Sequence, residues 1–227
     1  MNLSRSHVAR IAFSIMSIVV SAVAGAATSF VSMESATAPA GYLARLLINE
    51  NPFPGERGFI SVEDSKAGML QVLCVLHGRM YLVPAGYRAE HIAGVRTTNI
   101  LDVITAPRQC EGFSRDAAGR PVTAARVEQR LNNLLRIANS GGKPGKFADL
   151  LSYGQGLAHA YFIGGIKEAD RFAGLRMIRR VPVTGRAYSW MTDKDCYHPG
   201  GSFVSIPDDA GGDPGGNRFF TLRKDPQ

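Results

Sequence analysis

Apolar residues recur at helical spacing over most of the first two thirds of the chain. Leu43 and Leu47 belong to such a repeat, which predicts a helix that runs into Glu50. Pro52 and Pro54 follow directly, and a residue that precedes proline is pushed out of the α region. The helix is therefore predicted to end at Glu50, which faces a loop rich in proline and glycine.

A second helix is predicted from Ser61 to about residue 81. Glu63 and Asp64 fall in its first turn, where negative charge suits the helix dipole. Its apolar stripe consists of Met69, Val72, Leu73, Leu76 and Met80.

Further helices are predicted over 126–139, 147–162 and 166–177, with a short one over 90–95. From residue 181 onward the pattern changes to short strands and glycine-rich loops. The sequence therefore predicts a mainly α fold with a small β or loop portion (α+β).

The N-terminal residues 1–26 have the pattern of a secretory signal peptide. Two arginines precede an apolar run over 11–23, and Ala-Gly-Ala at 24–26 supplies small residues for cleavage. An uncleaved anchor is the alternative, although the run is short for a membrane span. We expect a linker over 27–40, a catalytic domain over 41–227, a secreted or periplasmic location, and no stable membrane insertion after cleavage.

The 227-residue chain carries a formal net charge of +7, which favours anionic partners such as nucleic acid, a membrane surface or an acidic cell wall polymer. The lysines and arginines are scattered and form no block of five, which argues against nucleic acid. P-loop, G-x-S-x-G and dinucleotide-binding motifs are absent.

Glu50 and Glu56 flank the loop between the first two helices. A carboxylate at the end of a buried helix is partly desolvated, and desolvation raises its pKa, as a general acid requires. The alternative is that both are surface glutamates beside a turn.

The segment ENPFPGE at 50–56, followed by a long apolar helix that ends in Arg79, resembles the SleB-type cell wall hydrolases. This resemblance implies a lysozyme-like fold, peptidoglycan as the partner, no cofactor, and Glu50 or Glu56 as the catalytic acid. The block over 126–177 would then be an extra helical block. Gly78 stands where the family usually has asparagine.

Two later segments extend the resemblance. In the family an apolar pair, here at 103–104, precedes a Gln-Phe pair that lines the sugar cleft, and Gln109 and Phe113 take those places here. Tyr188 matches a family tyrosine, and the neighbouring Trp190 is an aromatic that could stack on a sugar. Asn217 stands near the place of a C-terminal family histidine. These residues are expected to bind substrate.

The three cysteines leave two readings open. Cys74 lies on an apolar helix stripe and is expected to be buried, whereas Cys110 and Cys196 lie in loops and could form a disulfide in an oxidising compartment. Alternatively, Cys110 is the nucleophile of a cysteine peptidase that cleaves wall peptides, with His198 or His159 as the base.

No metal site is predicted, because the histidines lack ligand spacing and the aspartates at 208, 209 and 213 do not match a calcium loop. The favoured prediction is a secreted hydrolase or lytic transglycosylase of peptidoglycan glycan strands. A non-catalytic protein that binds the cell wall or a partner is the alternative from another functional class; the sequence leaves its protein partners unknown.

Overall fold

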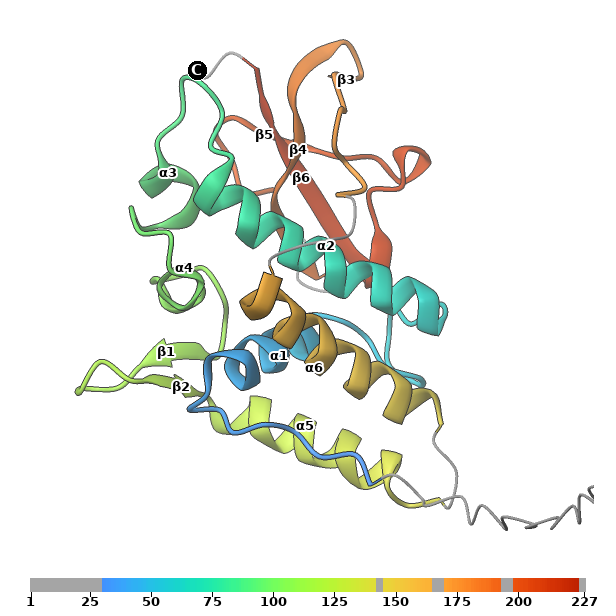
Figure 1. Ribbon diagram of the computed structural model, residues 1–227. Coiled ribbons are helices and arrows are strands. Elements are labelled where there is room, and N and C mark those ends of the chain that lie inside the picture. The colour runs from blue at the N-terminus through green and yellow to red at the C-terminus, as the bar shows by residue number, and fades with distance from the viewer. Residues whose placement is uncertain (1–29, 142–144, 165–169, 193–197, 225–227) are drawn as a thin grey trace, which may run out of the picture.

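The computed structural model describes residues 30–141, 145–164, 170–192 and 198–224. The predicted signal peptide and Cys196 lie outside these ranges. Three layers follow one another in Figure 1: the sheet β3-β4-β6-β5, then α2, then α1 and α6 with α5 below them. Among the described helices, none combines the length and apolar character that crossing a membrane requires.

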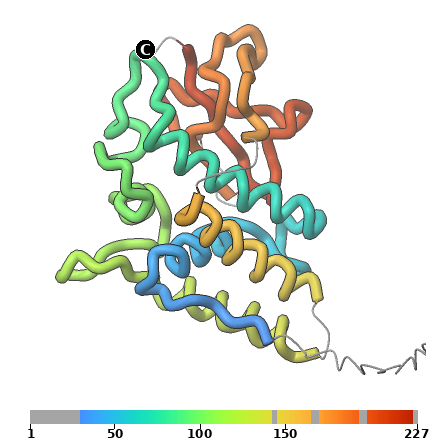
Figure 2. The backbone as a smooth tube through the Cα atoms, in the orientation of Figure 1, coloured from blue at the N-terminus to red at the C-terminus, as the bar shows by residue number. Residues whose placement is uncertain are grey.

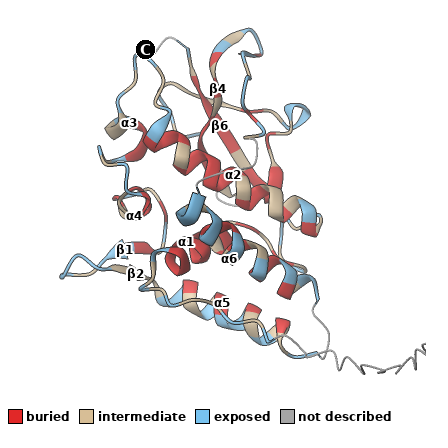
Figure 3. Cartoon of the chain, viewed as in Figure 1, coloured by how far each residue is buried: buried red, intermediate tan, exposed pale blue. Residues whose placement is uncertain are grey.

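Helix α1 (Pro39–Asn49) lies at the centre of the helical layers. Every residue from Ala40 to Ile48 is buried, as the continuous red of α1 in Figure 3 shows. Proline at its first position suits a helix start, because the missing N–H would have no partner there. Helices α2, α5 and α6 pack against it. The first predicted helix is confirmed, including its end at Glu50.

Helix α2 (Val62–Tyr81) separates α1 from the sheet. The Ser61 hydroxyl accepts a hydrogen bond from the Asp64 N–H at 3.0 Å, which caps the helix at the predicted residue. One face of α2 packs on α6 and α1, and the other packs on β4 and on the 3-10 turn η3 (Pro214–Gly216). The sequence therefore predicted this helix and its start correctly.

The remaining helices surround this centre. They are α3 (Ala89–Ala93), α4 (Ile100–Thr105), α5 (Ala125–Ala138) and α6 (Lys146–Gly164). The short hairpin of β1 (Phe113–Arg115) and β2 (Pro121–Thr123) extends from the molecule beside α4 in Figure 1. The predicted helices over 126–139 and 147–162 are confirmed.

The second sheet is antiparallel and consists of β3 (Met177–Ile178), β4 (Val181–Thr192), β6 (Asn217–Arg223) and β5 (Phe203–Ser205). Ala187 pairs with Thr221 and Ser189 with Phe220, so Tyr188 is an extra residue that forms a bulge in β4. As a result, four successive residues, 187–190, are buried.

The prediction of a mainly α, lysozyme-like fold is wrong, because this four-stranded sheet makes the protein a mixed α+β fold. The bulge in β4 removes the alternation of buried and exposed residues by which a half-buried strand is recognised. The partner strand β6 is also distant in sequence, so the pairing has no local signal.

The helix predicted over 166–177 is not formed in its described part. Residues 171–174 form a turn, and Met177 already belongs to β3. Gly174 has a φ of +89°, which no α-helix accommodates, and its N–H donates to the Gly185 carbonyl in β4. Phe172, in this turn, is nevertheless buried.

The predicted linker packs on the helical layers over 30–38. Val31 exchanges two hydrogen bonds with the Asn139 side chain, at 2.9 and 2.8 Å, and Figure 2 shows this segment running along α5. The Glu34 N–H donates to Gln155 at 3.1 Å. The last two residues of the predicted linker, Pro39 and Ala40, belong to α1.

Two glycines allow α2 and the turn η3 to approach closely. A Cβ atom added to Gly68 would lie 2.7 Å from the Cα atom of Gly215 and closer still to the Asn51 carboxamide. Gly215 itself has a φ of +63°. This contact holds the residues that follow α1 against the start of β6.

We expect Gly68→Ala to lower the free energy of unfolding by about 1–3 kcal/mol, because the added methyl group overpacks this contact. Gly156→Ala is the matched control: Gly156 is also helical, and a Cβ there would meet nothing within 4 Å. The control should stabilise the protein by up to about 1 kcal/mol through helix propensity. Urea denaturation measures both, and stabilisation of both variants would contradict the packing.

Candidate active site

A cleft of about 1090 Å³ opens beside the C-terminal end of α1. The loop that follows α1 forms one side, and residues 108–111 after α4 and residues 189–192 of β4 form others. Further lining comes from the end of α2 and the start of α5, and from residues of α3, β5 and η3. Glu50, Glu56, Gln109 and Trp190, which the sequence analysis named as catalytic or substrate-binding residues, all line this one cleft.

Glu50 directly follows the last residue of α1. Its carboxylate accepts a hydrogen bond from the Trp190 indole N–H at 3.0 Å, and the Asn49 amide lies at 3.5 Å. Burial raises the pKa of Glu50 and outweighs the opposing effects of these two hydrogen bonds and of Arg130. The side chain is therefore biased toward its protonated form, as a general acid requires.

Glu50 is positioned by the groups that cap the C-terminal end of α1. The Asn217 amide donates to the Glu50 carbonyl at 2.8 Å, and the Asn51 amide donates to the Leu47 carbonyl at 2.7 Å. Arg130 of α5 donates to the carbonyls of Ile48 at 2.8 Å and Asn51 at 2.9 Å. The last carbonyls of a helix run out of donors within the helix, so side chains from α5, from β6 and from the loop after α1 supply partners at this end.

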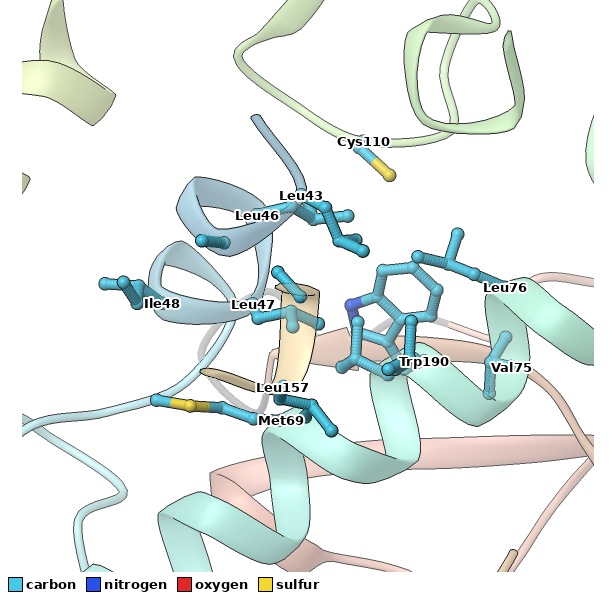
Figure 4. Packing of buried hydrophobic residues seen from close by; sticks show 14 of the residues in the cluster. Leu43, Leu46, Leu47, Ile48, Met69, Val75, Leu76, Cys110, Leu157 and Trp190 are labelled. Atoms are coloured by element: carbon cyan, nitrogen blue, oxygen red, sulfur yellow. The ribbon is translucent and has the colours of Figure 1, made fainter. Parts of the chain in front are cut away.

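Trp190 joins the acid to the hydrophobic core. In Figure 4 its indole ring lies between the side chains of α1 and α2. The Arg79 guanidinium stacks on this ring at 5.1 Å and donates to the Tyr188 carbonyl at 2.8 Å. Burial lowers the pKa of Arg79 to about 10, so the residue remains charged at neutral pH.

Gln109 lies in the cleft and accepts a hydrogen bond from Arg79 at 2.8 Å. Because its amide oxygen is used in this way, its NH₂ group remains available as a donor. The turn over 106–109 holds it there, with the Gln109 N–H donating to the Ala106 carbonyl at 3.1 Å.

Glu56 is held in a different way from Glu50. Its two oxygens accept from Arg130 at 3.0 and 2.5 Å, and one of them also accepts from the Phe53 N–H at 2.8 Å. Such a bidentate arginine–carboxylate pair fixes the loop that follows α1. The structure therefore gives Glu56 a structural role that the sequence does not reveal.

Three residues expected to bind substrate are not among the cleft-lining residues. Phe113 is buried and packs edge-on against Tyr42, with ring centroids 5.4 Å apart. Tyr188 is buried, and its hydroxyl donates to the Leu82 carbonyl at 2.5 Å. Asn217 is fully buried and acts on Glu50 through the backbone. They therefore support the walls of the cleft from behind.

Cys110 also lines the cleft, as a free and buried thiol. Burial raises its pKa, and Glu50 raises it further when it is ionised, so the thiolate is disfavoured. A ring nitrogen of His159 lies 2.8 Å from a carboxylate oxygen of Glu34, and His198 packs edge-to-face against Phe220. Cys196, the expected disulfide partner of Cys110, lies outside the described residues.

The cleft contains charged residues that the sequence analysis did not select. Arg57, Arg108, Arg126, Arg130 and Glu111 line it. The sequence does not distinguish an arginine that lines a cleft from any other exposed arginine. The one local signal is the pair Pro107-Arg108, which is typical of a tight turn. Within the described ranges, no group of three or more histidine, cysteine, aspartate or glutamate residues could hold a metal ion.

Several chemistry-bearing groups thus converge on one cleft: a half-buried carboxyl group whose pKa is raised, an amide donor, an indole and several arginines. Comparisons of the chain with protein-family models, with curated proteins and with solved structures find no match. The geometry of this cleft is therefore the basis on which a function is inferred.

Proposed function

We propose that this protein cleaves glycan strands of peptidoglycan, with Glu50 as the general acid. The observation that carries the proposal is the position of Glu50: it lies in a large cleft, at the end of a buried helix, with burial raising its pKa. Cleavage of a glycosidic bond needs a proton on the leaving oxygen, and a carboxyl group whose pKa is raised is suited to supply it.

The hydrogen bond from Trp190 orients the acid. One carboxyl oxygen of Glu50 accepts the indole N–H, and Asn49 lies near the other. Because the indole donates only, it holds its partner oxygen without taking the proton. Arg79, in turn, holds the indole through its stacking contact.

The reaction course follows from the state of the second glutamate. Glu56 is engaged by Arg130 and by the Phe53 N–H, so it is poorly placed to activate a water or attack a sugar. A mechanism that uses Glu50 as its single acid fits the engagement of Glu56. Glu50 protonates the glycosidic oxygen, the C–O bond breaks, and the muramic 6-hydroxyl attacks the same carbon and returns its proton to Glu50. This course consumes no water and gives anhydromuramyl products.

The polymer class is supported by two observations. The segment 50–56 with the helix up to Arg79 resembles the SleB-type hydrolases of peptidoglycan, and Glu50 is the residue that ends the first helix there. The cleft is also rich in arginine, which suits a polymer that carries carboxylates. The cysteine peptidase alternative has less support, because burial raises the pKa of the Cys110 thiol and neither candidate histidine lines the cleft.

We expect Glu50→Gln to lower kcat by at least about 100-fold, because the glutamine keeps the oxygen that accepts from Trp190 but has no proton to give. Digestion of purified peptidoglycan by residues 27–227, with mass spectrometry of the products, measures this. The wild type should release anhydromuramyl ends.

Glu63→Gln is the matched control, since Glu63 is exposed on α2 and does not line the cleft. It should retain full activity. Loss of cleavage with Glu56→Gln but not with Glu50→Gln would transfer the acid to Glu56. Stem peptides released by the wild type and lost with Cys110→Ala would contradict glycan cleavage. Binding without cleavage at any pH would favour the non-catalytic alternative.

The raised pKa of Glu50 also makes stability depend on pH. The folded protein binds the Glu50 proton more tightly than the unfolded chain, so this group's contribution is complete below its unfolded pKa, about 4.5. That contribution is lost as the pH rises through the folded pKa. Activity should fall over the same window, because the acid loses its proton.

We therefore expect Glu50→Gln to be more stable than the wild type at pH 8, by about 1 kcal/mol or about 2–4 °C in Tm, because it removes a buried charge. The difference should vanish at pH 4, where Glu50 is protonated. Thermal unfolding at both pH values measures this. An equal difference at pH 4 and pH 8 would show that Glu50 does not titrate with a raised pKa.

A further inference from the structure

The cleft carries an excess of positive charge that acid catalysis does not require. Five arginines line it, together with three glutamates. When Glu50 is protonated, as the proposed reaction requires, the excess amounts to three positive charges. A concave surface with one dominant sign of charge concentrates ligands of the opposite sign.

Three of these arginines already have partners. Arg79 donates to Gln109 and to the Tyr188 carbonyl. Arg130 pairs with Glu56, and Arg126 pairs with Glu111 at 2.6 Å. Their charges therefore hold the walls of the cleft.

Arg57 and Arg108 differ from the other three. Both are exposed, and neither makes a side-chain hydrogen bond or ion pair with another residue of the described chain. Arg57 lies in the loop after α1, on the same loop as Glu56, and Arg108 directly precedes Gln109. Both guanidinium groups are thus available to a ligand in the cleft.

The backbone at Arg108 is a second, independent observation. Arg108 has a φ of +64°, follows Pro107, and lies in the turn closed by the Gln109 N–H and the Ala106 carbonyl. Such a turn favours glycine or asparagine at this position, because a side chain is strained at positive φ. Strained residues are concentrated at sites that bind or react.

Two other arginines of the described chain have a positive φ for a different reason. Arg179 and Arg180 also have positive φ, but they form the two-residue connection between β3 and β4, where hairpin geometry requires it. Arg108 is not part of a hairpin. Its conformation costs stability and places a guanidinium on the edge of the cleft.

We propose that Arg57 and Arg108 bind carboxylate groups carried by the glycan, so that the protein acts on acidic strands and discriminates against neutral ones. This proposal rests on the function proposed above and adds the substrate class. A planar guanidinium matches a carboxylate with two parallel hydrogen bonds, which gives direction as well as charge. The carboxylates of peptidoglycan have two sources: the stem peptides, and the lactyl group of muramic acid wherever its stem peptide has been removed.

The test measures binding to insoluble peptidoglycan by co-sedimentation, with all proteins in the Glu50→Gln background so that no substrate is cleaved. We expect Arg57→Gln/Arg108→Gln to weaken the Kd by about 10- to 100-fold and to reduce its salt dependence. The matched control is Arg136→Gln/Arg180→Gln, which removes the same charge outside the cleft and includes one residue with positive φ. It should change the Kd by less than about twofold.

Three forms of the wall material identify the group that is bound. On intact material the two double variants should differ, and on material whose carboxylates have been amidated with carbodiimide they should not. An amidase that removes the stem peptides frees the lactyl carboxylates. On this stripped glycan, a retained difference shows that the two arginines bind the lactyl carboxylate, and a lost difference assigns the stem peptides. Equal losses in both double variants, or a difference that survives amidation, would overturn the proposal.

The active protein separates this proposal from the proposed function. With Glu50 present, Arg57→Gln/Arg108→Gln should raise KM about 10-fold or more and leave kcat within about threefold. Cleavage with an unchanged KM would overturn the arginine proposal alone. Arginine-dependent binding without cleavage by the wild type would overturn the proposed function alone.

Arg108→Gly is a further variant that retains the fold. Because glycine fits the turn, Tm should rise by about 2–4 °C while binding to the wall weakens. A lower Tm together with weaker binding would indicate that Arg108 has only a structural role, which would contradict the proposal for this residue.

Discussion

A short helix buried on every side must have its terminal carbonyl groups satisfied inside the protein, and this requirement organises the structure around α1. Residues 40–48 of α1 are buried, and side chains from other elements supply partners for the carbonyls at its end. Arg130 of α5, Asn51 of the following loop and Asn217 of β6 satisfy the carbonyls at the C-terminal end. The same contacts fix the backbone of Glu50.

The close packing of α2 on the turn η3 is part of this arrangement. Gly68 and Gly215 allow two backbones to meet beside the Asn51 carboxamide, which also contacts the Asn217 amide at 3.3 Å. A strand from the end of the chain is thereby brought to the end of its first described helix. The cleft lies where these elements meet, and its acid is supported on several sides by groups with little freedom to move.

Charge is distributed around the cleft in a consistent way. Two partly buried ion pairs brace the helical layers: Arg45 with Glu128 at 2.8 Å, and Arg130 with Glu56. Glu50 has no such paired arginine, and its burial favours the neutral form. One carboxyl group is thus left chemically available while its neighbour Glu56 is not, although the two are only a few residues apart in sequence.

Local sequence signals predicted a large part of the fold. Proline after α1, the Ser61 cap of α2 and the helical spacing of apolar residues in α5 act over a few residues, and the elements that they predict are present. The turn at 171–174 was missed because it depends on the hydrogen bond from the Gly174 N–H to the Gly185 carbonyl, in a strand that follows it in the sequence. The extent of the sheet was missed for a related reason, since the bulge at Tyr188 hides the strand pattern.

The candidate site was likewise predicted only in part from the sequence. The sequence by itself determined that α1 ends at Glu50, because helix termination depends on neighbouring residues, and it thereby presented Glu50 and Glu56 as a pair. Only the tertiary structure decided that Arg130 engages Glu56, that Trp190 holds Glu50, and that Phe113, Tyr188 and Asn217 support the cleft from behind. Each of these roles depends on contacts between residues far apart in the chain, and no local pattern records which distant groups become neighbours when the chain folds.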